Sequence, residues 1–190
     1  DGTKTREEAL ALLCGSGYDG KILAGGQTLV PSMNFRLAQP GILIDLNRIG
    51  DLFGIGASDD GGLRIGAMTR QREVERSALV QARAPLVHEA MPFIAHPQIR
   101  NRGTIGGSLS HADPAAELPA LMVALGAKMK VQRWGPEIEE RIVSAEEFFL
   151  GQFTTAMEPN EMLVDVIIHP PPPRTAPALE ECSRPPAEET

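Results

Sequence analysis

The chain has 190 residues, of which 42% are hydrophobic and 23% charged, with 19 glycines and 16 prolines. This composition is typical of a folded mixed α/β protein and excludes collagen-like, coiled-coil and low-complexity chains. The formal net charge of -7 disfavours binding to nucleic acid or to an anionic membrane, because both need clustered Lys and Arg. A phosphate bound by this chain is therefore expected to meet backbone N–H groups.

The only two cysteines, Cys14 and Cys182, are far apart and show no CxxC spacing. They therefore support neither a disulfide framework nor an iron–sulfur or zinc site. No apolar run approaches the roughly 20 residues of a membrane-spanning helix, and the first residues do not resemble a signal peptide. A reducing cytoplasm is the expected location.

The chain begins with a predicted helix and a buried strand. Thr5 and Glu8 have the spacing of a capping box, which predicts a helix that ends at Gly15. Residues 21–24, three of which are apolar, predict a short buried strand that runs directly into the pair Gly25-Gly26. A glycine turn is therefore expected at the end of this strand.

A short helix and a second strand follow the glycine turn. Pro31 suits the first turn of a helix that includes Phe35, and residues 42–46 predict a second buried strand, parallel to the first. Residues 1–52 are therefore predicted to form an N-terminal α/β lobe.

Residues 53–169 are predicted to form a second, α+β lobe, so that the fold class is mixed α/β. Two hairpins and a final strand are expected in it, at residues 53–57, 63–67, 128–132, 138–142 and 163–168. A second capping-box spacing, from Ser144 to Glu147, predicts a short helix. The proline-rich residues 170–190 are predicted to be a linker.

Three longer helices are predicted in the second lobe, with a loop over residues 97–111 between the second and the third. Thr69 is expected to cap the first helix, and Asp113 is expected to cap the third, which Gly126 closes. Their ranges are 69–74, 86–95 and 115–125.

The first glycine pair is a candidate phosphate site. Gly25 and Gly26 stand where a strand turns into a helix, so bare backbone amides and a helix N-terminus can face an anion. A tight turn without any ligand is an equally good interpretation of this one loop, because glycine pairs commonly form turns.

A second glycine pair, Gly106-Gly107, is flanked by the hydroxyl groups of Thr104 and Ser108. Such neutral donors can surround the other side of a diphosphate, as an acidic protein requires. Neither loop matches the P-loop pattern GxxxxGK(S/T) or the Rossmann pattern GxGxxG. The two loops together predict a dinucleotide that is bound in a different way.

Several charged residues near the second loop have two interpretations. Glu117 follows Asp113 by four residues and can accept hydrogen bonds from ribose hydroxyls, but helix capping for Asp113 and solvent exposure for Glu117 are as plausible. Arg100 and Arg102 can approach a phosphate, or form surface or intersubunit ion pairs.

The remaining polar residues give no sign of catalysis. The four histidines show no metal-binding spacing and accompany no nucleophile motif, so they are interpreted as structural or surface residues: His88, His96, His111 and His169. No side chain stands out as an acid–base catalyst.

Three stretches resemble the FAD-binding medium subunit of molybdenum hydroxylases, the family of carbon monoxide dehydrogenase and xanthine dehydrogenase. They are AGGQTLVPSMNFRL at 24–37, IDLNRI at 44–49 and RNRGTIGGSLSHADPAAELP at 100–119. The resemblance implies a two-lobed FAD-binding domain of the vanillyl-alcohol-oxidase or PCMH type. It also implies a third, C-terminal domain, which is expected to be largely absent from this chain.

The resemblance implies which residues bind FAD. The diphosphate would lie between the two glycine motifs and the ribose near the acidic residue that follows the second. The implied residues are Ile22, Leu23, Ala24, Gly25, Gly26, Gln27, Thr28, Leu29, Thr104, Ile105, Gly106, Gly107, Ser108 and Glu117.

The resemblance also implies partners. A small subunit would carry two 2Fe–2S clusters and a large subunit the molybdenum cofactor, in a dimer of heterotrimers where electrons pass from molybdenum through the clusters to FAD and an external acceptor. The flavin would perform the redox step, so no catalytic residue is expected here. The alternatives are an FAD-free assembly module of the same complex and, less favoured, a stand-alone flavin oxidase.

Overall fold

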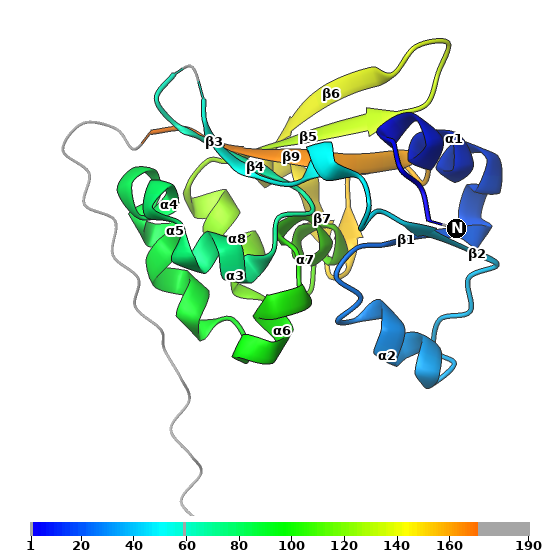
Figure 1. The fold of residues 1–190 in the computed structure, drawn as a ribbon, viewed down its shortest axis with the longest axis horizontal. Coiled ribbons are helices and arrows are strands. Elements are labelled where there is room, and N and C mark those ends of the chain that lie inside the picture. Colours follow the sequence, from blue (N-terminus) through cyan, green and yellow to red (C-terminus); the bar gives the residue numbers. More distant parts are fainter. Residues whose placement is uncertain (1, 59, 171–190) are drawn as a thin grey trace, which may run out of the picture.

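The computed structural model describes residues 2–58 and 60–170, so Cys182 and all but the first residue of the predicted linker lie outside the described residues. A five-stranded antiparallel sheet forms the centre of the described fold (Figure 1). Its strands, in spatial order, are β3 (Ile55–Ala57), β4 (Leu63–Gly66), β9 (Glu161–Ile168), β5 (Lys128–Arg133) and β6 (Glu139–Ser144). Both predicted hairpins, β3–β4 and β5–β6, are confirmed.

Strand β9 is the middle strand of this sheet. Seven of its eight residues are buried, because it pairs with β4 on one side and β5 on the other and is covered on both faces. Leu163 and Ile168 belong to one hydrophobic core, whereas Met162 and Val164 belong to a second one. The predicted last strand is confirmed and begins two residues earlier than expected.

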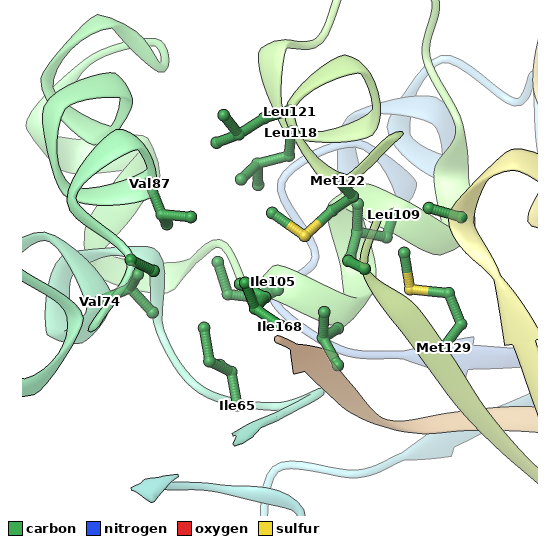
Figure 2. Packing of buried hydrophobic residues seen from close by; sticks show 14 of the residues in the cluster. Ile65, Val74, Val87, Ile105, Leu109, Leu118, Leu121, Met122, Met129 and Ile168 are labelled. Carbon is green, nitrogen blue, oxygen red and sulfur yellow. The ribbon is translucent and has the colours of Figure 1, made fainter. Parts of the chain in front are cut away.

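The larger core lies between the sheet and a layer of helices on one of its faces (Figure 1). In Figure 2, Ile65 and Met129 of the sheet face the helical residues Val87, Leu118 and Leu121. The helices are α3 (Gln71–Arg76), α4 (Ala78–Arg83), α5 (Pro85–Ala90), α6 (Pro97–Arg102), α7 (Ile105–His111) and α8 (Glu117–Ala124), followed by α9 (Ala145–Phe148) and the small hairpin β7 (Phe149–Gly151) and β8 (Thr154–Thr155).

The smaller core joins the N-terminal elements to the end of the sheet. Helix α1 buries Ala9, Leu10 and Leu13 against the β2 residue Ile44 and against Met162 of β9. The N-terminal elements are α1 (Arg6–Ser16), β1 (Gly20–Leu23), α2 (Leu29–Asn34) and β2 (Ile42–Asp45), with short 3-10 turns at Gly17–Asp19 and Gly50–Leu52. Strands β1 and β2 are parallel, as predicted. The lobe boundaries at residues 52 and 169 stay a prediction.

The hydroxyl half of both predicted capping boxes is confirmed, but neither glutamate accepts a hydrogen bond from the N–H of its cap residue. The Thr5 hydroxyl accepts a hydrogen bond from the Glu8 N–H at 3.2 Å, and the Ser144 hydroxyl accepts one from the Glu147 N–H at 3.3 Å. The Glu8 carboxylate accepts from the Lys4 N–H, one residue before the expected partner. Helix α1 also runs one residue past Gly15.

Two helix predictions in the second lobe were wrong in detail. Thr69 caps no helix: its hydroxyl accepts from the Gly54 N–H and donates to the Gly54 carbonyl, and α3 begins after Arg70. The helix predicted over residues 86–95 ends at Ala90 and continues as a 3-10 turn, Met91–Phe93. The break follows from Pro92, which has no N–H to continue the helical ladder.

The loop predicted over residues 97–111 was also wrong, because this segment forms helices α6 and α7. Burial of Ile105 and Leu109 in the larger core overrides the low helix propensity of the glycine pair. The predicted cap of the following helix is displaced as well: Asp113 accepts from the Ala115 N–H at 2.9 Å, but α8 begins only at Glu117.

Candidate cofactor site

The first glycine motif forms the turn between β1 and α2. Gly26 has φ of +71°, in the left-handed region that L-residues disfavour. A Cβ atom on Gly25 would lie 2.8 Å from the Cα atom of Gly103, so Gly25 lets this turn pack against the junction of α6 and α7. Glycine is thus required at residue 26 by the backbone conformation and at residue 25 by close packing.

This turn carries a run of consecutive backbone N–H groups without an acceptor among the residues that the structure describes, and the run includes those of Gly25, Gly26, Gln27, Thr28 and Leu29. Pairing resumes at Val30, whose N–H donates to the Gly26 carbonyl at 3.1 Å. Because unpaired backbone donors are costly when they are shielded from water, a run of them beside a cavity favours binding of an anion.

The backbone N–H groups of the second glycine motif already have acceptors within the protein. Thr104 caps α7, since its hydroxyl accepts from the Gly107 N–H at 3.0 Å and its carbonyl accepts from the Ser108 N–H. The Ile105 and Gly106 N–H groups donate to the carbonyls of residues 69 and 67. The motif therefore presents hydroxyl groups rather than amides to a ligand, and the Ser108 hydroxyl has no partner among the described residues.

The two motifs lie next to each other although about 80 residues separate them. A Cβ atom on Gly107 would lie 3.4 Å from the Cβ atom of Ala24 and 2.7 Å from the Thr104 hydroxyl. One on Gly106 would lie 2.5 Å from the Cβ atom of Ala67. Glycine at both positions thus allows α7 to approach the sheet and the first turn closely.

The space between the motifs is a cavity of about 830 Å³. Twelve of the fourteen residues predicted to bind FAD line it: Ile22, Ala24, Gly25, Gly26, Gln27, Thr28, Leu29, Thr104, Gly106, Gly107, Ser108 and Glu117. Leu23 instead lines a second cavity of about 400 Å³, and Ile105, 1% exposed, is buried in the larger core. The structure therefore brings together most of what the sequence singled out.

Acidic residues line another part of the cavity wall, where Glu117 and Asp113 are joined by Glu158 and Glu161. Burial raises the pKa of the Glu161 carboxyl, but hydrogen bonds from the Arg141 guanidinium and the Glu158 N–H, together with the nearby Arg141 and Arg133 charges, hold that pKa below its ordinary value. Carboxylates at this wall can accept hydrogen bonds from hydroxyl groups such as those of ribose, and their negative charge repels a phosphate.

A hydrogen-bonded network that the sequence did not reveal holds the first turn in place. The Arg70 guanidinium donates to the Asn47 side-chain carbonyl at 2.6 Å and to the backbone carbonyl of Arg102. Asn47 in turn donates to the Ala24 carbonyl at 3.0 Å. Burial, and next to it the nearby Arg102 charge, lowers the pKa of Arg70. The network joins the ends of β2 and α6 to the glycine turn.

Arg100 has a structural role, so the idea that it approaches a phosphate was wrong. Its side chain is 5% exposed, and its Nε donates to Glu75 at 2.9 Å. Its Nη1 donates to the backbone carbonyls of Pro92, Ile94 and Ala95. Because Ile94 and Ala95 line the cavity, the bonds from Arg100 hold this part of the cavity wall in position.

Several further polar residues of the cavity wall escaped the sequence analysis, among them Gln71, Ser110 and His111. His111, interpreted from the sequence as a structural or surface residue, packs against Phe153 with 5.1 Å between the ring centroids. A helix assigned to residues 105–111 would have placed Gly107, Ser110 and His111 on one face. The spacing was not recognised because residues 97–111 were predicted to be a loop.

A mixed α/β fold with a cavity of this size, bounded by unpaired turn amides, hydroxyls and carboxylates, defines a site for a phosphate-bearing nucleotide cofactor. Residues 3–172 match the family described as "FAD binding domain in molybdopterin dehydrogenase". The chain belongs to this family. Proteins similar to it include subunits of dehydrogenases.

Characterised relatives agree with the family match. The chain is 47% identical over 163 residues to the carbon monoxide dehydrogenase medium chain of Hydrogenophaga pseudoflava, covering 86% of this chain and 55% of that one. It is 44% identical to the 6-hydroxypseudooxynicotine dehydrogenase complex subunit alpha of Paenarthrobacter nicotinovorans, covering 94% and 59%. The chain thus spans somewhat more than half the length of these relatives.

Solved structures show the same fold. Carbon monoxide dehydrogenase from Hydrogenophaga pseudoflava superposes with a TM-score of 0.84 at 44% identity, covering 89% of this chain and 57% of that chain. Quinoline 2-oxidoreductase from Pseudomonas putida 86 gives 0.84 at 38% identity, covering 90% and 58%. Among residues 2–58 and 60–170, no helix has the length and apolar character to cross a membrane.

Proposed function

We propose that this chain binds one FAD in the 830 Å³ cavity and transfers electrons within a molybdenum hydroxylase complex. The observation that carries the proposal is the juxtaposition of the two glycine motifs, with a run of unpaired backbone N–H groups on the first of them. Neutral N–H and hydroxyl donors on the two motifs suit a diphosphate in an acidic protein. The FAD-binding family to which the chain belongs supports the identity of the cofactor.

Different residues of the cavity would bind different parts of FAD. The N–H groups of residues 25–28 would bind the diphosphate, together with the hydroxyls of Thr104 and Ser108, whereas the Glu117 carboxylate would accept from ribose hydroxyls. Ile22 and Leu29 would contribute apolar contacts. Leu23 and Ile105 would act only by fixing the positions of their neighbours, since neither lines this cavity.

When bound, FAD supplies the redox chemistry, accepting electrons from the iron–sulfur clusters of a partner and passing them to an external acceptor. The chain's own residues bind and orient it. The resemblance to medium subunits supports two partners, a small iron–sulfur subunit and a large subunit with the molybdenum cofactor, and the names of relatives as complex subunits agree with this. A dimer of such heterotrimers in the cytoplasm is part of the proposal.

An FAD titration of the purified protein tests the cofactor site. Valine at Gly107 would collide with the Thr104 hydroxyl and crowd Ala24, so Gly107→Val is expected to weaken FAD binding about tenfold or more. Gly56→Val is the matched control, because nothing lies within 4 Å of a Cβ atom built on Gly56 in β3. It should leave FAD affinity within about twofold.

The outcomes separate the two candidate functions. A wild-type protein that takes up FAD and loses it in Gly107→Val supports the flavoprotein. A folded wild-type protein that rejects FAD but copurifies with iron–sulfur and molybdenum subunits favours the FAD-free assembly module. For the electron path, reduction of the partner's clusters in the assembled complex should bleach the flavin band near about 450 nm. A flavin that stays oxidised would contradict that path.

A further inference from the structure

Gln71 is a buried polar residue on the cavity wall whose hydrogen bonding is incomplete. The residue is 5% exposed and lines the cavity, yet its Oε1 atom has no hydrogen-bond partner among the described residues. A buried carboxamide oxygen without a partner is unfavourable, because it has lost its hydrogen bonds to water and gained none. Rotation about the last side-chain bond lets either the oxygen or the nitrogen of the carboxamide face the cavity.

The position of Gln71 is fixed by the backbone around it. Its N–H donates to the Gly103 carbonyl at 2.9 Å, and an isolated β-bridge joins Arg70 to Thr104. A Cβ atom on Gly103 would lie 2.9 Å from the Gln71 Oε1. The side chain therefore stands directly beside the second glycine motif.

The surrounding wall is apolar. Met68, Ile94, Ala95 and Ile99 line the cavity together with Gln71. An apolar wall that contains a single carboxamide suits a flat heterocycle, whose faces need apolar contact and whose edge needs hydrogen bonds. The other buried glutamine, Gln132, shows the usual state, since its carboxamide pairs with Glu140 at 2.9 Å.

We propose that the Gln71 carboxamide binds the edge of a heterocyclic ring of FAD at which an N–H donor and an acceptor lie side by side. The flavin pyrimidine ring has such an edge in its imide, and adenine has one in its amino group and ring nitrogen, with which glutamine forms paired hydrogen bonds. The proposal rests on the proposed function, because it requires FAD in this cavity.

Gln71→Met tests the proposal, because methionine keeps the length of the side chain and removes its polar atoms. FAD affinity should fall about fivefold to a hundredfold, the worth of a pair of hydrogen bonds. The thermal midpoint of the FAD-free protein should stay the same or rise, because an unpartnered polar group has been removed. Gln132→Met, which breaks existing bonds outside the cavity, should lower the midpoint and leave FAD affinity unchanged.

Titrations with riboflavin 5′-phosphate, ADP and inorganic pyrophosphate identify the ring. A loss confined to riboflavin 5′-phosphate assigns the flavin edge, and a loss confined to ADP assigns the adenine edge; both support the proposal. An FAD affinity within twofold of wild type overturns it, as does an equal loss for all ligands including pyrophosphate. A wild-type protein that binds no FAD overturns the proposed function as well.

Discussion

Replacement of Arg100 by methionine tests the mechanics of the cavity wall. Arg100 is the buried residue that ties Glu75 to the backbone of residues 92–95, through a 2.9 Å bond to the carboxylate and bonds of 2.8 and 3.0 Å to the Ile94 and Ala95 carbonyls. Methionine retains the apolar stem but donates none of these bonds. Glu75 then keeps only Arg72, at 2.7 Å.

The expected loss of unfolding free energy follows from the bonds that the Arg100 side chain makes. Removal of one partner of a buried ion pair costs about 3–5 kcal/mol, and the remaining Arg72 contact places Arg100→Met near the lower end, about 3 kcal/mol. For a chain of this size that corresponds to a fall in thermal midpoint of roughly 6–12 °C. The double variant Arg100→Met with Glu75→Leu should recover part of the loss, because no unpaired charge remains buried.

Urea unfolding at several pH values measures the prediction. The hydrogen bond from Arg100, followed by that from Arg72, lowers the pKa of Glu75 below its ordinary value. The resulting stabilisation is fully present above that ordinary value and is lost as the pH falls through the lowered one. Wild type should therefore lose stability in acid more steeply than Arg100→Met. A variant within about 1 kcal/mol of wild type at pH 7, with the same acid dependence, would refute the reasoning.

Three smaller changes test the site itself. Gly26→Ala places a side chain at φ of +71° and 3.0 Å from Val30, so it should cost about 1–2 kcal/mol in unfolding free energy and weaken FAD binding. Ser108→Ala should leave the thermal midpoint unchanged and lower FAD affinity about tenfold by titration, whereas equal affinities would exclude its hydroxyl from the site. Arg70→Met frees Asn47 and the first turn, so FAD should dissociate faster in stopped-flow experiments; an unchanged rate would contradict the positioning role.

Local patterns were sufficient to predict most strands and the Thr5 and Ser144 helix caps. The hairpins, the parallel pair β1–β2 and the central strand follow from runs of apolar residues bounded by turn residues. The glycine motifs were recognised from their flanking strand and hydroxyl residues, and the resemblance joined them into one site. Short-range signals therefore predicted the elements and most of the cavity lining.

Long-range packing decided what the sequence could not predict. Glycine at 106 and 107 favours a loop by propensity, but burial of Ile105 and close contact with Ala67 produce a helix. Arg100 pairs with Glu75, 25 residues away, and no local pattern indicates that contact. Gln71 becomes a cavity residue only because α3 meets the end of α6.

Hydrogen–deuterium exchange of the Gly25–Thr28 amides, with and without saturating FAD, tests the central claim most directly. These N–H groups have no acceptor among the described residues, so they should exchange rapidly in the FAD-free protein. Binding of the FAD diphosphate should slow their exchange strongly, while the amides of the edge strand β6, whose residues do not line the cavity, serve as the unaffected reference. Bound FAD that leaves the exchange of these amides unchanged would contradict the account.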